Sequence, residues 1–159
     1  MTKIGIIKNL IPKFNNIIIV GGMANNIINY QGHKIGKSIK EVNCEKAIKE
    51  IFETSKNHSC GITFPEDVLI GKNINDNSTI KELDDIENDD LILDIGPKTV
   101  KKVKDIVKKS KTVLWNGPAG YFENPNFASG SYEIVKAIVK KNKQNSIYSV
   151  IAVSYTHLR

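Results

Sequence analysis

Short apolar runs that stop at glycine constrain the fold of this 159-residue chain more than any other feature. A short apolar run bounded by glycine is typical of a strand buried on both faces of a parallel sheet. Open α/β sheets bind ligands at the carboxyl ends of their strands. We therefore expect three such ends to share one edge and to form one cleft: Gly21 and Gly22 after residues 16–20, Gly96 after residues 91–95, and Gly117 after residues 112–115.

Stretches with helical periodicity separate the apolar runs. Helices are predicted at residues 23–30, 43–55 (with Asn43 as N-cap), 97–109 and 131–141, and further strands at 61–65, 67–71, 78–80 and 146–152. Residues 72–90 are polar and acidic, with no steady period. The alternation predicts the α/β class: a Rossmann-like, open, mainly parallel sheet of about six strands with helices on both faces.

The positive charge of the chain is spread along its length. Lysine and arginine number 23 and acidic residues 17, which gives a net charge of +6. The lysine runs stand at predicted helix ends, where they complement the helix dipole. We interpret them as solvated surface. Because aromatic residues are not interleaved with them, a basic module that binds nucleic acid is not favoured.

Several other classes of protein are excluded by composition. The sequence has no run of about twenty apolar residues, so no membrane span is expected. Its first residues lack the apolar core of a signal peptide, which favours the cytoplasm. Cys44 and Cys60 have no metal-like spacing with each other or with the three histidines. We therefore expect two reduced thiols and no metal site.

One stretch, residues 114–123, combines a strand end with polar, ligand-binding chemistry. Asn116 both donates and accepts hydrogen bonds, and two glycines flank Pro118, so a ligand can approach the backbone closely. Glu123 can accept two hydroxyl protons, as a ribose would offer them. This stretch is the strongest candidate for a binding site.

The same stretch resembles the Trp-Asn-Gly-Pro-x-Gly-x-Phe-Glu segment of the phosphoglycerate kinase family, in its nucleotide-binding C-terminal domain. Most of the chain, from Lys3 to about Val150, agrees with that family in order and spacing. Four more stretches carry the resemblance: Gly21-Gly22-Met23-Ala24, Ile35-Gly36-Lys37-Ser38, Phe64-Pro65-Glu66-Asp67-Val68 and Asp94-Ile95-Gly96-Pro97-Lys98-Thr99.

The resemblance implies transfer of phosphate between ATP and 3-phosphoglycerate. It would place Lys3 near the transferred phosphoryl group as the catalytic lysine. It would place Gly21, Gly22 and Gly96 against the adenine. Asn116 and Pro118 would lie near the phosphates and ribose, and Glu123 would hold the ribose hydroxyls. The implied cofactor is ATP or ADP, with Mg²⁺ in the intact enzyme. The intact enzyme is expected to be a monomer, with no nucleic acid or membrane partner.

Departures from the family predict a fragment that is incomplete at both ends and inactive alone. The domain that binds 3-phosphoglycerate does not precede Lys3. The family's Gly-Gly-Gly-Asp turn, whose aspartate contacts magnesium, does not follow Ala152. We therefore expect residues 1–152 to form a truncated three-layer αβα domain and residues 153–159 to be a tail unlike the family. Asn25 and Asn26 also stand where the family has apolar or aromatic residues.

Two alternatives remain beside the kinase hypothesis. A dehydrogenase-like NAD domain needs Gly-x-Gly-x-x-Gly after its first strand, and residues 20–25 do not supply that spacing. Titration followed by NADH fluorescence would detect such a domain. A basic nucleic-acid-binding module would show a salt-dependent gel shift.

Overall fold

The computed structural model of this chain describes residues 3–144 and 148–152. Its helices are α1 (Lys3–Leu10), α2 (Gly22–Tyr30), α3 (Glu45–Asn57), α4 (Pro97–Lys109) and α5 (Ser129–Lys143). Its strands are β1 (Asn16–Ile18), β2 (Gly61–Thr63), β3 (Asp67–Gly71), β4 (Thr79–Glu82), β5 (Leu91–Ile95), β6 (Thr112–Asn116) and β7 (Tyr148–Ala152). Residues 146–147 of the predicted last strand, and the predicted tail at 153–159, lie outside the described residues.

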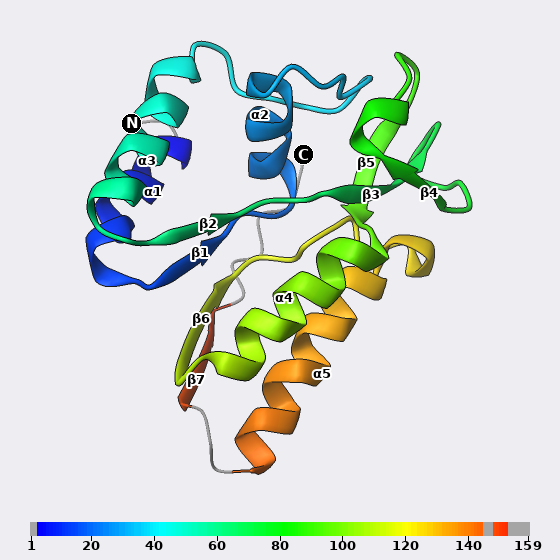
Figure 1. The fold of residues 1–159 in the computed structure, drawn as a ribbon. Coiled ribbons are helices and arrows are strands. Elements are labelled where there is room, and N and C mark those ends of the chain that lie inside the picture. The colour runs from blue at the N-terminus through cyan, green and yellow to red at the C-terminus, as the bar shows by residue number, and fades with distance from the viewer. Residues whose placement is uncertain (1–2, 145–147, 153–159) are drawn as a thin grey trace.

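The α/β class is confirmed, and parallel pairing joins the strands at both ends of the chain. Strand β1 pairs in parallel with β2, and β6 pairs in parallel with β7. These two pairs lie next to different groups of helices (Figure 1). Helices α1 to α3 are near β1 and β2, and helices α4 and α5 are beside β6 and β7.

The two faces of β1 show why the domain has three layers. Ile17 and Ile19 pack into a cluster formed with α1, α2 and α3. Ile18 and Val20, which alternate with them, pack into a cluster formed with α4 and α5. Successive side chains of a strand point to opposite faces, so one apolar run buries itself against helices on both sides. This confirms the prediction drawn from residues 16–20.

The strand at residues 91–95 does not join the parallel pairs. Strand β3 lies between β4 and β5 and is antiparallel to both. Parallel strands need a long crossover, usually a helix, whereas antiparallel neighbours need only a short connection. The acidic stretch between β3 and β5 provides β4 and one short 3₁₀ turn, Leu83–Asp85, but no helix long enough for a crossover.

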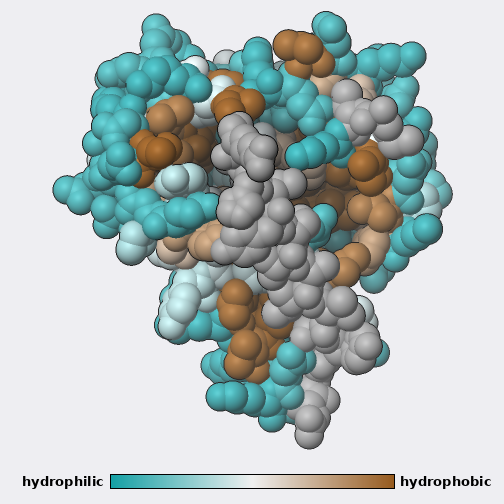
Figure 2. All heavy atoms as spheres, turned by 180° about the vertical axis from the view of Figure 1, so that it is seen from behind, coloured by the Kyte–Doolittle hydropathy of each residue, from teal (hydrophilic) through white to brown (hydrophobic). Residues whose placement is uncertain are grey.

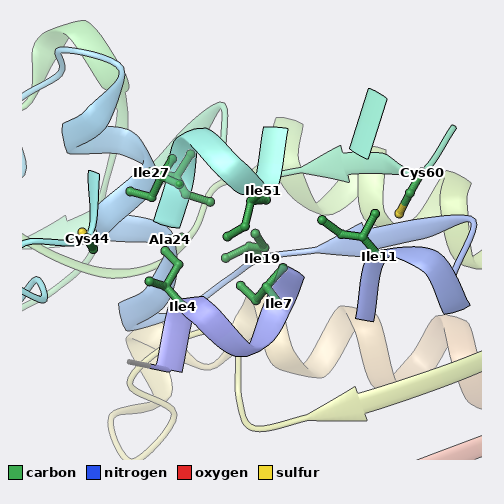
Figure 3. Close-up of a cluster of buried hydrophobic side chains, with 10 residues drawn as sticks. Ile4, Ile7, Ile11, Ile19, Ala24, Ile27, Cys44, Ile51 and Cys60 are labelled. Carbon is green, nitrogen blue, oxygen red and sulfur yellow. The ribbon is translucent and has the colours of Figure 1, made fainter. Parts of the chain in front are cut away.

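The predicted N-cap of α3 was wrong by one residue. The helix begins after Cys44, and Asn43 precedes it with a φ of 57°. Asparagine tolerates this left-handed conformation better than most residues. The helix itself was predicted at this place, and its residues Ile48 and Ile51 are completely buried. Ile51 lies beside α1 in the cluster shown in Figure 3.

Helix α1 had no counterpart in the sequence prediction. Its buried residues, Ile4 and Ile7, face the same cluster as α3 (Figure 3). The helix has only eight residues and contains Gly5, so its periodic signal is weak. Packing against α3 therefore stabilises it more than its own propensity does. Among the described residues, no helix is long and apolar enough to cross a membrane.

Candidate functional site

Two glycine turns from distant parts of the chain meet at the strand ends. Gly21 follows β1 with a φ of 66°, and a methyl group on it would lie 3.2 Å from the carbonyl oxygen of Pro118. Gly117, directly after β6, has a φ of 80° and open space beside its α-carbon. Gly22 is exposed and faces open space as well. The structure thus brings the Gly21-Gly22 turn against the loop that begins with Asn116.

The amino terminus of α2 opens at this junction without a cap. Gly21 is its N-cap residue and offers no side chain, and the first turn contains no acidic residue. The first backbone N–H groups of a helix have no partner within the helix, and together they carry a partial positive charge. A helix terminus of this kind is suited to an anion such as a phosphate group.

The amino terminus of α4, in contrast, is already filled by a carboxylate from β3. Asp67 accepts hydrogen bonds from the backbone N–H groups of Lys98 (3.0 Å) and Thr99 (2.9 Å), and from the Thr99 hydroxyl (2.7 Å). The Thr99 oxygen in turn accepts from the N–H groups of Glu66 and Asp67. Asp67 and Thr99 are both completely or almost completely buried.

Gly96 belongs to this internal cap. It is buried, and a methyl group on its α-carbon would overlap the Asp67 carboxylate. Its N–H donates to the Asp67 carbonyl at 2.9 Å. The geometry therefore explains why glycine is needed there without a ligand, and a contact of Gly96 with adenine stays a prediction.

The amino terminus of α5 is filled in the same manner by Asp94 of β5. Its carboxylate accepts from the N–H of Gly130 at 2.9 Å and from the N–H of Ile95 at 2.8 Å. Burial raises the pKa of Asp94, although these N–H groups and the Ser129 hydroxyl lower it in part. Of these three helices, α2 alone lacks a side-chain acceptor at its amino terminus.

The loop after β6 is fixed by contacts with β5 and α5. The N–H of Tyr121 donates to the Leu93 carbonyl at 2.7 Å, and the N–H of Ala119 donates to the Ser131 hydroxyl at 2.8 Å. The sequence analysis missed Leu93 and Ser131, because neither stands in a recognisable motif. Glu123 follows this anchored segment and is exposed, with no ion pair among the described residues.

Lys3 lies at the start of α1, on the same side as the opening of α2. Its neighbour Ile4 is completely buried, in one cluster with Ala24 of the first turn of α2 (Figure 3). Lys3 itself is exposed. The structure therefore places α1 beside α2 but shows no hydrogen bond or ion pair between Lys3 and the two glycine turns.

A cluster of three acidic side chains lies at the other end of β5. In the described part of the chain, Glu87, Asp89 and Asp90 form the one group close enough to hold a metal ion. Two lysines already neutralise these carboxylates, since Lys72 forms ion pairs with all three and Lys81 forms ion pairs with Glu87 and Asp90. Burial raises the pKa of Asp90, but the hydrogen bonds from Lys72 and Lys81 outweigh it and hold the pKa at about 2.

Comparison with known proteins decides the family. A family model described as phosphoglycerate kinase matches residues 1–157. This chain belongs to the phosphoglycerate kinase family. A phosphoglycerate kinase of Lactobacillus acidophilus is 43% identical over 146 residues, which are 91% of this chain and 36% of that protein. One of Dictyoglomus turgidum is 39% identical over 147 residues, which are 91% of this chain and 37% of that protein.

The fold agrees with solved structures of the family. The structure of phosphoglycerate kinase from Coxiella burnetii matches with a TM-score of 0.86 and 30% identity, over 94% of this chain and 38% of that one. This chain thus spans little more than a third of the length of the relatives it matches. Membership in the family disfavours both the NAD domain and the nucleic-acid-binding module.

Proposed function

We propose that this chain binds ATP or ADP where the Gly21-Gly22 turn meets the Asn116–Pro118 loop, as the nucleotide-binding part of a phosphoglycerate kinase. Such an enzyme transfers a phosphoryl group between 1,3-bisphosphoglycerate and ADP. The observation that carries the proposal is the uncapped amino terminus of α2 beside Pro118, while Asp67 and Asp94 fill the corresponding ends of α4 and α5.

Each residue of the proposed site has a role that its chemistry allows. Gly21 and Gly22 let the nucleotide approach the backbone, because no side chain occupies that space. Asn116 can hydrogen-bond to the phosphates or ribose, and Glu123 can accept from the ribose hydroxyls. Lys3 would offset negative charge on the phosphoryl group. Phosphoryl transfer depends chiefly on such positioning and charge stabilisation, because the protein forms no covalent bond in most such reactions.

The 159-residue polypeptide by itself is expected to bind nucleotide without turnover. It spans 36% of a relative's length, so we assign the site for 3-phosphoglycerate to the part of the enzyme outside it. The described residues offer no cluster of acidic ligands at the proposed site, so magnesium should improve nucleotide affinity little. A coupled assay of ATP consumption with 3-phosphoglycerate should read background. Turnover that survives further purification and falls in Lys3→Ala would overturn this expectation.

The nucleotide site can be tested with two glycines at opposite ends of α2. Gly21→Ala strains a residue with a φ of 66° and places a methyl group 3.2 Å from the Pro118 carbonyl. Gly32→Ala strains a φ of 93° at the far end, in open space. Calorimetry with ADP should show at least about tenfold weaker binding for Gly21→Ala, roughly 1.4 kcal/mol, and unchanged binding for Gly32→Ala. Equal loss in both variants would contradict the assignment.

A further inference from the structure

A lysine-lined groove lies between α4 and α5, and its lining includes no residue of the Gly21-Gly22 turn or of the Asn116–Pro118 loop. It has a volume of about 1270 Å³ and continues onto β3 and β4. In Figure 1, α4 and α5 lie side by side below the antiparallel sheet. Six lysines line the groove: Lys101, Lys104 and Lys108 of α4, and Lys136, Lys140 and Lys141 of α5.

The spacing of these lysines explains how they reach one groove. Positions three, four and seven apart share one face of a helix. Lys101, Lys104 and Lys108 therefore form one stripe on α4, and Lys136 and Lys140 form another on α5. Packing of the two helices against each other turns the stripes toward a common groove. Lysines that are dispersed in the sequence become a local concentration of positive charge.

The groove keeps most of this charge. Its lining contains two acidic residues, Asp105 and Glu133. Glu133 forms ion pairs with Lys104 at 3.0 Å and with Lys136 at 3.4 Å. The hydrogen bond from Lys104 is the main reason why the pKa of Glu133 is lowered. Lys101, Lys108 and Lys140 form no ion pair with any residue that the structure describes.

Apolar side chains supply the floor between the lysines. Leu69, Ile95, Val100 and Ala137 line the groove from four elements, β3, β5, α4 and α5. Ile80 of β4 stands at one end of it with 58% of its surface exposed. An apolar floor between basic rims is complementary to a helix with one apolar face and acidic flanks, a common mode of peptide recognition.

The size and the lining of the groove favour such a helix over other negatively charged ligands. Pockets for small molecules measure about 300–1,000 Å³, so a groove of 1270 Å³ is larger than one such ligand needs. Proteins that bind single-stranded nucleic acid stack its bases on aromatic rings, and among the side chains that the structure describes no aromatic one lines this groove. The amino termini of α4 and α5 are already occupied by Asp67 and Asp94, so they do not attract phosphate.

We propose that the groove between α4 and α5 is a docking surface for an acidic, amphipathic helical segment of a partner protein. The partner's apolar face packs on Ile80, Val100 and Ala137. Its carboxylates pair with Lys101, Lys108 and Lys140.

The test uses the 159-residue chain and a fluorescein-labelled synthetic helix of about five turns, with leucine on one face and glutamate on the other. Fluorescence anisotropy should show saturable binding that weakens at least tenfold between low and physiological salt, since salt screens exposed charges. The triple variant K101E/K108E/K140E should lose binding. The matched triple variant K13E/K34E/K56E, which makes the same change of charge at exposed lysines outside the groove, should keep it. Equal loss in both variants would overturn the proposal.

A second pair of variants tests the apolar floor without altering charge. Ile80→Ser should weaken binding of the leucine–glutamate helix about fivefold or more, whereas Ile39→Ser, at a position 77% exposed and outside the groove, should not. Competition by unlabelled polyglutamate, tripolyphosphate or a single-stranded RNA should require far higher concentrations. If any of them competes as well as the amphipathic helix, the groove is a general anion surface and the proposal is wrong.

Discussion

At the scale of single residues, the structure assigns internal roles to side chains that look like ligand-binding groups in the sequence. Asp67 and Asp94 stand in two of the five stretches that resemble the kinase family, yet both are buried and bind helix amino termini. Gly36 is similar: its φ is 59°, and a methyl group there would overlap the Asp90 carbonyl. Motif residues therefore include groups that build the fold as well as the groups proposed to bind the nucleotide.

The Asp67 cap predicts a large effect on stability. Asp67→Asn removes a negative charge from the amino terminus of α4 and disturbs three hydrogen bonds. We expect the free energy of unfolding to fall by about 2–3 kcal/mol, as for other buried charged hydrogen bonds. Asp105→Asn, on the exposed side of the same helix, should change it by less than about 0.5 kcal/mol. Denaturant titration measures both, and similar values would refute the internal cap.

Asp90 predicts loss of stability in acid. Its pKa of about 2 in the folded chain lies below the ordinary value near 3.9. Its contribution is therefore present above about pH 4 and is lost as the pH falls toward 2, amounting to about 2 kcal/mol. Asp90→Asn should flatten this part of the stability profile, while Asp85→Asn at an exposed site should not. If the dependence of stability on pH were unchanged in Asp90→Asn, Lys72 and Lys81 would not lower the pKa of Asp90 as stated.

Asp94 should act in the opposite direction. Burial raises the pKa of Asp94 in the folded chain. Its contribution to the free energy of unfolding is therefore complete at a pH below the ordinary pKa of aspartate, and it is lost as the pH rises through the raised pKa of the folded chain. Denaturant titrations of Asp94→Asn across this range should lack that decline with rising pH. A decline of the same size in both proteins would show that Asp94 does not titrate differently after folding.

At the scale of elements, a substitution at the uncapped amino terminus of α2 should raise the stability of the helix and lower the affinity for nucleotide. Gly22 is exposed and has room for a side chain, so Gly22→Asp should stabilise the helix by a few tenths of a kcal/mol through its dipole. The same carboxylate would repel the negatively charged nucleotide proposed to bind where this turn meets the Asn116–Pro118 loop. We expect ADP affinity to fall while the melting temperature holds or rises, and Gly22→Asn serves as the uncharged control. Unchanged ADP affinity in Gly22→Asp would argue against a nucleotide bound beside this helix end.

At the scale of the whole molecule, the described part of the chain exposes large apolar side chains on several of its elements. Hydrophobic side chains gather in separate patches on the face shown in Figure 2. Ile6 of α1 is 47% exposed and Leu114 of β6 is 53% exposed. No strand ladder joins β1 to β6 within the described residues, so the two parallel pairs are linked mainly through side-chain packing.

This arrangement predicts marginal stability of the 159-residue polypeptide. Exposed apolar patches and unpaired strand edges favour association and local opening. We expect the chain to bind a dye specific for exposed apolar surface and to unfold over a broad range of temperature. A sharp two-state transition without dye binding would contradict this prediction. It would show that side-chain packing between β1 and β6 is strong enough to offset the exposed apolar patches and unpaired strand edges.

The sequence by itself determined the class, the family and the order of all helices and strands except α1. Apolar runs and helical stripes are local patterns, and each fixes one element through burial of its own side chains. The stretch at residues 114–123 likewise carries its signal within ten neighbouring positions. Even the two-sided burial of β1 follows from a continuous apolar run.

Only the tertiary structure decided the antiparallel place of β5, the caps supplied by Asp67 and Asp94, and the meeting of Gly21 with Pro118. The capping hydrogen bonds join residues 31 to 36 positions apart, and the two turns are farther apart still. Local periodicity carries no information on such partners. They are selected when the chain collapses and every buried N–H and carboxylate must find a partner.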